Sequence, residues 1–140
     1  MERDQGRIDA EHLRLLAIFH FVAAGLAALG LLFVGVHFAL FHLVFSHPEM
    51  WDKSKQAPPP AELFLIFRWF YVVFVAWFLG SGIVNLLSGL FLRARRHRVF
   101  SMVVAGLNCV YMPLGTVLGV FTLLVLVRDS VRDSYASGQT

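Results

Sequence analysis

Three long stretches of the sequence contain no Asp, Glu, Lys or Arg, and each is long enough to matter to a lipid bilayer. They are Leu15–Ser46, Trp69–Leu92 and Val99–Val127. A charged side chain at the bilayer centre costs about 2.5–3.5 kcal/mol, so charge-free apolar runs of this length are typical of membrane-spanning helices. The sequence therefore predicts an integral membrane protein.

The composition agrees with an all-α polytopic bundle. Hydrophobic residues make up 58% of the chain and charged residues 15%, whereas soluble domains average about 25% charged residues. A length of 140 residues leaves room for a single membrane domain over residues 1–140. The basic residues flank the apolar runs, so the predicted partner is the lipid bilayer, and no nucleic acid is expected.

Turn residues divide the chain into about four helices, predicted at residues 11–45, 61–92, 95–112 and 116–133. An extracytoplasmic loop is expected at 46–60, which ends in three prolines that no helix interior tolerates. The run 99–127 is either one span kinked at Pro113 or two short helices. Pro113, Gly115 and Thr116 together favour a turn, and hence two helices.

The first two predicted helices are longer than the roughly 20 residues that cross a bilayer. We therefore expect them to form a hairpin that projects beyond the lipid, although helix tilt in a thick membrane is the alternative. The projecting part is rich in phenylalanine, and such a surface is unusual on a monomer. The predicted contact surface, for a homo-oligomer or a larger membrane complex, comprises Phe38, Phe41, Phe45, Phe64 and Phe67.

Basic residues beside the apolar runs predict the orientation in the membrane. Arg68 and Trp69 suit the headgroup region, where an aromatic ring keeps its polar edge wet. The densest positive charge is a group of four arginines after the second apolar run, which should face the cytoplasm. Both termini are then cytoplasmic, and we expect lipid headgroup contacts from Arg68, Trp69, Arg93, Arg95, Arg96 and Arg98.

The intramembrane polar candidates are His20, Asn85 and Asn108. Each would be costly facing lipid, so each should point into the bundle, with His20 bonded to a neighbouring helix and the asparagines packed between helices. Consecutive histidines from His20 to His47 are 17, 5 and 5 residues apart, whereas ligand pairs on a helix are usually three or four apart. We predict no metal site and no bound cofactor.

No recognised catalytic motif occurs in the sequence, so we predict that the chain is not an enzyme. The leading hypothesis is a non-catalytic membrane module, either an accessory or assembly subunit or a self-associating protein, that acts through the projecting hairpin. One alternative is a small oligomeric channel or carrier lined by the intramembrane polar candidates. A second alternative is a haem- or quinone-binding membrane protein that uses His20.

The C-terminal third resembles a family of small, uncharacterised bacterial inner-membrane proteins. The resemblance lies in residues 103–109 and in Pro113-Leu-Gly-Thr-Val-Leu-Gly-Val-Phe-Thr-Leu, and residues 11–26 are also similar to that family. Together these segments cover about a quarter of the chain. The resemblance implies a bacterial origin and a compact multi-span protein of the inner (plasma) membrane, and it brings no known activity with it.

Overall fold

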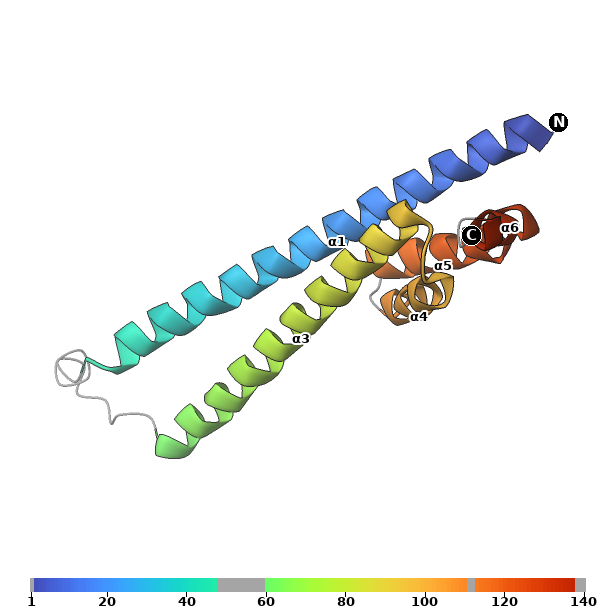
Figure 1. Ribbon diagram of the computed structural model, residues 1–140. Helices are drawn as coiled ribbons and strands as arrows, with labels where there is room; N and C mark the ends of the chain where they lie inside the picture. The colour runs from blue at the N-terminus through green and yellow to red at the C-terminus, as the bar shows by residue number, and fades with distance from the viewer. Residues whose placement is uncertain (1, 48–59, 111–112, 138–140) are drawn as a thin grey trace. The chain divides into compact units, whose positions relative to one another are not determined.

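Every regular element that the structure describes is a helix (Figure 1). The computed structural model describes residues 2–47, 60–110 and 113–137. Its helices are α1 (Glu2–Phe45), α3 (Ala61–Ala94), α4 (Arg98–Asn108), α5 (Leu114–Val127) and α6 (Asp129–Ser137). The predicted all-α fold is confirmed, and α1 and α3 are long and apolar enough to cross a membrane. Most of the predicted loop 46–60 lies outside the described residues.

The described ranges contain five helices where about four were predicted, because the last predicted helix is interrupted. Arg128 has an extended backbone, with φ −61° and ψ 136°, so the predicted helix 116–133 is divided into α5 and α6. The two helices are bent by 71° at this break. At the other end of the chain, α1 starts nine residues before its predicted start, at Glu2, and its polar first turns contact the α5–α6 break.

The predicted third helix, 95–112, begins later than expected. It starts only at Arg98, because Arg95 and His97 have positive φ angles of 51° and 49° that a right-handed helix cannot contain. Its last helical residue is Asn108. Arg95 closes α3 instead: its N–H donates to Leu92 O and the Arg96 N–H to Phe91 O. This is the Schellman pattern, in which glycine usually holds the left-handed position.

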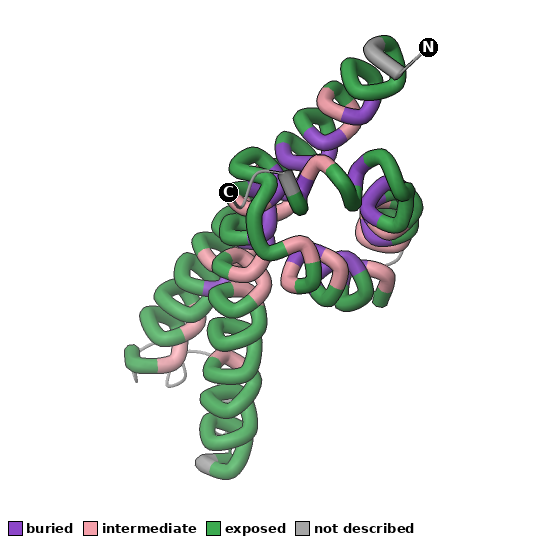
Figure 2. The backbone as a smooth tube through the Cα atoms, turned by 45° about the vertical axis from the view of Figure 1, so that its right-hand side comes forward, coloured by how far each residue is buried: buried purple, intermediate pink, exposed green. Residues whose placement is uncertain are grey.

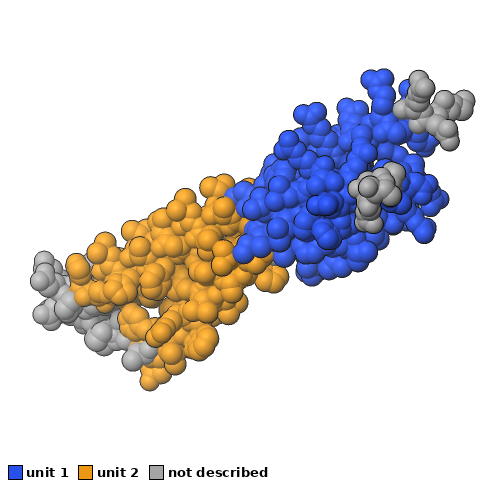
Figure 3. All heavy atoms as spheres, viewed as in Figure 1, with its two compact units in different colours: residues 1–25, 82–140 blue, residues 26–81 orange. Residues whose placement is uncertain are grey.

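The helices form two compact units, coloured separately in Figure 3. Unit 1 contains residues 1–25 and 82–140, and unit 2 contains residues 26–81. The apolar core of unit 1 draws on α1, α3, α5 and α6. It consists of Leu13, Leu16, Ala17, Leu92, Val125, Leu126, Val131 and Tyr135.

Close approach of helices in unit 1 depends on two glycines. A Cβ atom at Gly119 of α5 would overlap Ala105 O of α4 and lie 2.5 Å from Cys109 Sγ. A Cβ at Gly89 of α3 would lie 2.7 Å from the Phe21 ring of α1. Both positions therefore need a residue without a side chain, as is common where membrane helices pack closely.

Unit 2 consists of residues 26–45 of α1 against 61–81 of α3, and it has almost no core. Among its described side chains only Ala27 and Val34 are buried, so most of the tube for these two segments is coloured exposed in Figure 2. Gly30 lies against the Phe78 ring, which an added Cβ would overlap.

Each long helix carries a stripe of covered residues at seven-residue spacing. On α1 these are Leu13, His20, Ala27 and Val34, all buried. On α3 the half-buried Tyr71 and Phe78 are followed by the buried Asn85 and Leu92. A period of 3.5 residues per turn is typical of helices that pair with a shallow left-handed crossing.

Candidate functional site

The two asparagines predicted to lie within the membrane pair with each other inside unit 1. Asn108 Nδ2 donates to Asn85 Oδ1 at 2.8 Å, and Asn85 Nδ2 donates to Asn108 Oδ1 at 3.2 Å. Both side chains are buried, with 2% and 5% of the surface of Asn85 and Asn108 exposed. The pair joins the last residue of α4 to α3.

His20 is fully buried in unit 1, but it does not bond a neighbouring helix as predicted. Its Nδ1 lies 2.9 Å from Leu16 O, one turn earlier on α1. A carbonyl oxygen can only accept, so Nδ1 carries the hydrogen, and in the neutral ring Nε2 is left with a lone pair. Nε2 is buried and has no hydrogen-bond partner among the described residues.

Unit 1 also contains two buried serines that the sequence did not single out as polar candidates. Ser88 of α3 and Ser101 of α4 are fully buried, and neither hydroxyl has a hydrogen-bond partner within the described residues. Gly89 packs against Ala17 and Phe21, which brings the adjacent Ser88 to the level of His20 on α1. Buried polar atoms in proteins are usually satisfied, so this group of hydroxyls and imidazole is unusual.

Apolar core residues of unit 1 lie on one side of His20 and Ser88. Along α1, Leu13, Leu16 and Ala17 precede His20, and along the antiparallel α3, Leu92 follows Ser88. Both sets of core residues therefore lie on the side of His20 and Ser88 that leads to the basic 93–98 segment. The polar atoms are enclosed between helices, in surroundings where each unpaired group costs about 1–3 kcal/mol.

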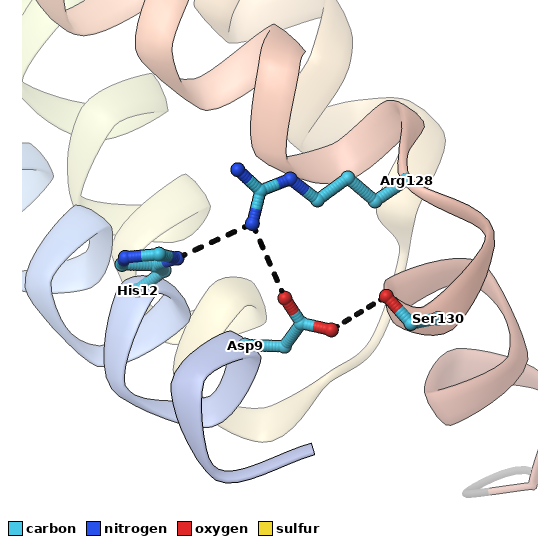
Figure 4. Close-up of polar contacts among 4 residues, drawn as sticks. All are labelled: Asp9, His12, Arg128 and Ser130. Carbon is cyan, nitrogen blue, oxygen red and sulfur yellow. Dashed lines mark hydrogen bonds and ion pairs between the residues drawn. The ribbon is translucent and has the colours of Figure 1, made fainter. Parts of the chain in front are cut away.

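A carboxylate near the start of α1 holds the α5–α6 break (Figure 4). Asp9 is nearly buried, and its carboxylate lies 3.4 Å from Arg128 Nη1 and accepts a hydrogen bond from Ser130 Oγ at 2.5 Å. Arg128 Nη1 also lies 3.5 Å from His12 Nδ1. Because the Arg128 side chain is 47% exposed, the ion pair contributes at most about 1 kcal/mol. Its role is to fix where α5 ends.

The basic segment after α3 has a structural role as well as the predicted headgroup role. Arg98 is half-buried and its Nε donates to Leu126 O at 2.7 Å, which satisfies a carbonyl at the end of α5. Arg93, Arg95 and Arg96 are exposed. Burial raises the pKa of the Tyr135 hydroxyl on α6, and the charges of Arg95 and Arg98 act in the opposite direction.

Four of the five phenylalanines predicted as a contact surface, Phe41, Phe45, Phe64 and Phe67, contact one another within unit 2. The Phe41 ring centre lies 4.2, 6.1 and 5.0 Å from the ring centres of Phe45, Phe64 and Phe67. Phe38 makes an edge contact with Tyr71, whose hydroxyl pairs with His37 Nδ1 at 2.7 Å. These rings join α1 to α3, and Phe38, Phe64 and Phe67 stay exposed as well, so the predicted contact surface stays a prediction.

Arg68 and Trp69 lie on the exposed surface of α3, and their headgroup contacts stay a prediction. With Leu65 and Val72 they line a shallow groove, and the spacing of these four residues places them on one helix face. Within the described part of the chain, no three His, Cys, Asp or Glu side chains lie close enough together to hold a metal ion.

Comparisons with protein-family models, with curated proteins and with solved structures find no match to this chain. The resemblance to small inner-membrane proteins stays a prediction. Function therefore has to be inferred from the chemistry and exposure of the chain's own residues.

Proposed function

We propose that the chain is a non-catalytic module of the bacterial inner membrane that works by association, either with further copies of itself or as an accessory subunit. The single observation that carries this proposal is the near absence of a core in unit 2. These two helices bury only Ala27 and Val34 among their described residues in this unit, so their apolar side chains need other apolar groups around them. Lipid acyl chains cover part of this apolar surface, and a protein partner covers the remainder.

Helix length favours a protein partner for the part of unit 2 near residues 45 and 61. At 1.5 Å per residue, the charge-free run from Leu15 to Ser46 is about 48 Å long, whereas the hydrocarbon core is about 30 Å thick. The hairpin then projects beyond the lipid, and Leu40, Leu43 and Leu65, each more than 50% exposed, form the surface available to a partner. The aromatic cluster behind them keeps the two helices together.

The arginines favour one orientation of this module. Arg93, Arg95 and Arg96 follow the second apolar run, and Arg128 and Arg132 follow the third, so both groups suit the cytoplasmic side. Both termini then lie in the cytoplasm and the 46–60 loop lies outside it.

The test compares oligomeric mass in native nanodiscs with crosslinking in native membranes. Wild-type protein should form an oligomer or a crosslinked complex, and the double variant Leu40→Ser/Leu43→Ser should lose it. The matched control is Leu29→Ser/Leu32→Ser, on similarly exposed residues of the same helix at membrane depth. A wild-type protein that is strictly monomeric in mild detergent and crosslinks to nothing would contradict the proposal.

A small oligomeric channel or carrier is the second candidate, because His20, Asn85 and Asn108 all lie in unit 1, together with two serine hydroxyls that have no partner among the described residues. Its test is solute or proton flux into proteoliposomes. Flux that Asn85→Leu/Asn108→Leu abolishes, while the protein stays folded, would favour transport over association.

An absorbance spectrum of the same preparation tests haem binding at His20, since bound haem gives a Soret band.

A further inference from the structure

Helices α4 and α5 are both too short to cross a bilayer. α4 has 11 residues and α5 has 14, which correspond to about 16 Å and 21 Å, against a hydrocarbon thickness of about 30 Å. Each length nevertheless exceeds the roughly 15 Å of a single leaflet. The two helices could therefore enter one leaflet and return, but neither could reach the opposite side.

The two helices of this pair are tied together at both ends. The Arg98 side chain at the start of α4 donates to Leu126 O near the end of α5. At the other end, Thr116 Oγ1 donates to Cys109 O, and Gly119 sits against Ala105. These contacts make α4 and α5 an antiparallel hairpin, and Cys109 and Pro113 lie near its tip.

The tip lies about half a bilayer away from the basic end of α3. Asn108 is bonded to Asn85, which precedes Ala94 by nine residues, or about 13 Å of helix. The other end of α4 is tied to α3 by the short 95–97 connection. Because α4 is held to α3 at both ends, it runs back along α3, and its tip is level with Asn85.

Several backbone polar groups in the described residues on either side of the tip are bonded within the hairpin, as the interior of a membrane requires. The Cys109 N–H donates to Ala105 O and Gly106 O, and the Val110 N–H donates to Leu107 O. The Val117 N–H donates to Pro113 O. The Thr116 hydroxyl donates a hydrogen bond to the Cys109 carbonyl oxygen at 2.8 Å.

The outward faces of both helices are apolar and exposed, whereas their inward faces carry the buried Asn108, Ser101 and Thr122. In the sequence from 93 to 132, every arginine flanks the open end of the hairpin. The outward residues, all more than half exposed, are Val99, Val103, Leu107 and Val110 on and just after α4, and Leu114, Val117, Phe121, Leu124 and Val127 on α5.

We propose that α4 and α5 form a re-entrant hairpin that fits the acyl chains of one leaflet, with its arginines among the phosphates of the same leaflet. The hairpin rests on the proposed membrane residence, and it goes beyond it by specifying two full spans, α1 and α3, instead of four. Apolar length, charge at one end only and hydrogen bonds within the hairpin beside its tip all match a single leaflet.

The test measures depth along the hairpin with single nitroxide labels, from the ratio of oxygen to nickel-chelate accessibility. Cys109 is the only cysteine in the chain, so a Cys109→Ala background is sufficient, with labels at exposed positions 99, 103, 107, 110, 117, 121, 124 and 127. Depth should rise from Val99 to a maximum near the bilayer centre at Val110, and fall again to Val127.

Two full crossings would instead place the label at Val110 among the opposite headgroups, with the deepest labels near the middle of each helix. Strong access of the nickel chelate at every position would place the hairpin outside the lipid. Either result would overturn the re-entrant assignment. Neither would affect the oligomer measurement with Leu40→Ser/Leu43→Ser, so failure of the hairpin assignment and failure of the proposed function remain distinguishable.

Discussion

At the scale of single residues, the reciprocal Asn85–Asn108 contact is the only described place where two side-chain amides of unit 1 bond each other across helices. Interhelical hydrogen bonds in membranes contribute about 0.6 kcal/mol on average. The Asn85–Asn108 pair also positions the tip of α4. Its contribution to stability can exceed that average, because removing one side chain leaves the other amide buried without this bond.

The two asparagines should therefore be coupled in a double-mutant cycle. We expect Asn108→Leu and Asn85→Leu each to destabilise the protein, and the double variant to be about 1 kcal/mol more stable than the sum of the singles. Steric trapping in bicelles measures the free energy of unfolding for all three. Strictly additive losses would mean that the amides do not depend on each other.

Arg95 holds the left-handed position at the end of α3, which costs a residue with a side chain about 1–2 kcal/mol. Arg95→Gly should therefore raise the free energy of unfolding by about 0.5–1 kcal/mol. The matched control is Arg96→Gly, at an adjacent position without a positive φ angle, which should be neutral or destabilising. The same unfolding assay measures both, and equal effects at the two sites would contradict the strain at Arg95.

At the scale of elements, the α4–α5 pair shows how one position sets the distance between two helices. Gly119 allows backbone contact with Ala105 O, and Cys109 lies beside it. Gly106, one position further along α4, faces open space, and a Cβ added there would meet no atom within 4 Å. The two glycines therefore differ: the close α4–α5 contact requires a glycine at position 119, whereas position 106 has room for a side chain.

Gly119→Ala should destabilise the protein by about 1–3 kcal/mol, because backbone atoms of α4 cannot move aside as a flexible side chain would. Gly106→Ala is the control and should be neutral or stabilising by up to about 1 kcal/mol, since alanine is the better helix former. Thermal unfolding in a fixed detergent compares the two. A Gly119→Ala variant as stable as wild type would contradict the close α4–α5 contact.

At the scale of the whole molecule, the length of α1 decides between a projecting hairpin and a tilted one. A lysine at Leu26, near the centre of the apolar run, should raise the apparent free energy of membrane insertion by about 2.5–3.5 kcal/mol. A lysine at Leu43, which is similarly exposed, should cost less than about 1 kcal/mol if that turn lies beyond the lipid. Equal penalties in an insertion assay would instead favour a tilted α1 embedded throughout.

The all-α class, the two long apolar helices and the burial of His20, Asn85 and Asn108 could all be predicted from the sequence. Apolar length and the cost of polar groups in lipid act on every residue regardless of its neighbours, so hydropathy along the chain is enough to find them. The separation of α4 from α5 near Pro113 was predictable for a similar reason, because Pro and Gly act locally.

The ends of the C-terminal helices and the pairing of polar atoms could not be predicted, because they depend on tertiary contacts. The break after α5 depends on Asp9, which lies 119 residues from Arg128 in the chain, and the start of α4 depends on Arg95 and His97 adopting left-handed conformations. Asn85 bonds Asn108, 23 residues along the chain, only because the packing brings α3 and α4 together. Contacts between distant segments select among such alternatives, and the hydropathy of a single sequence does not distinguish them.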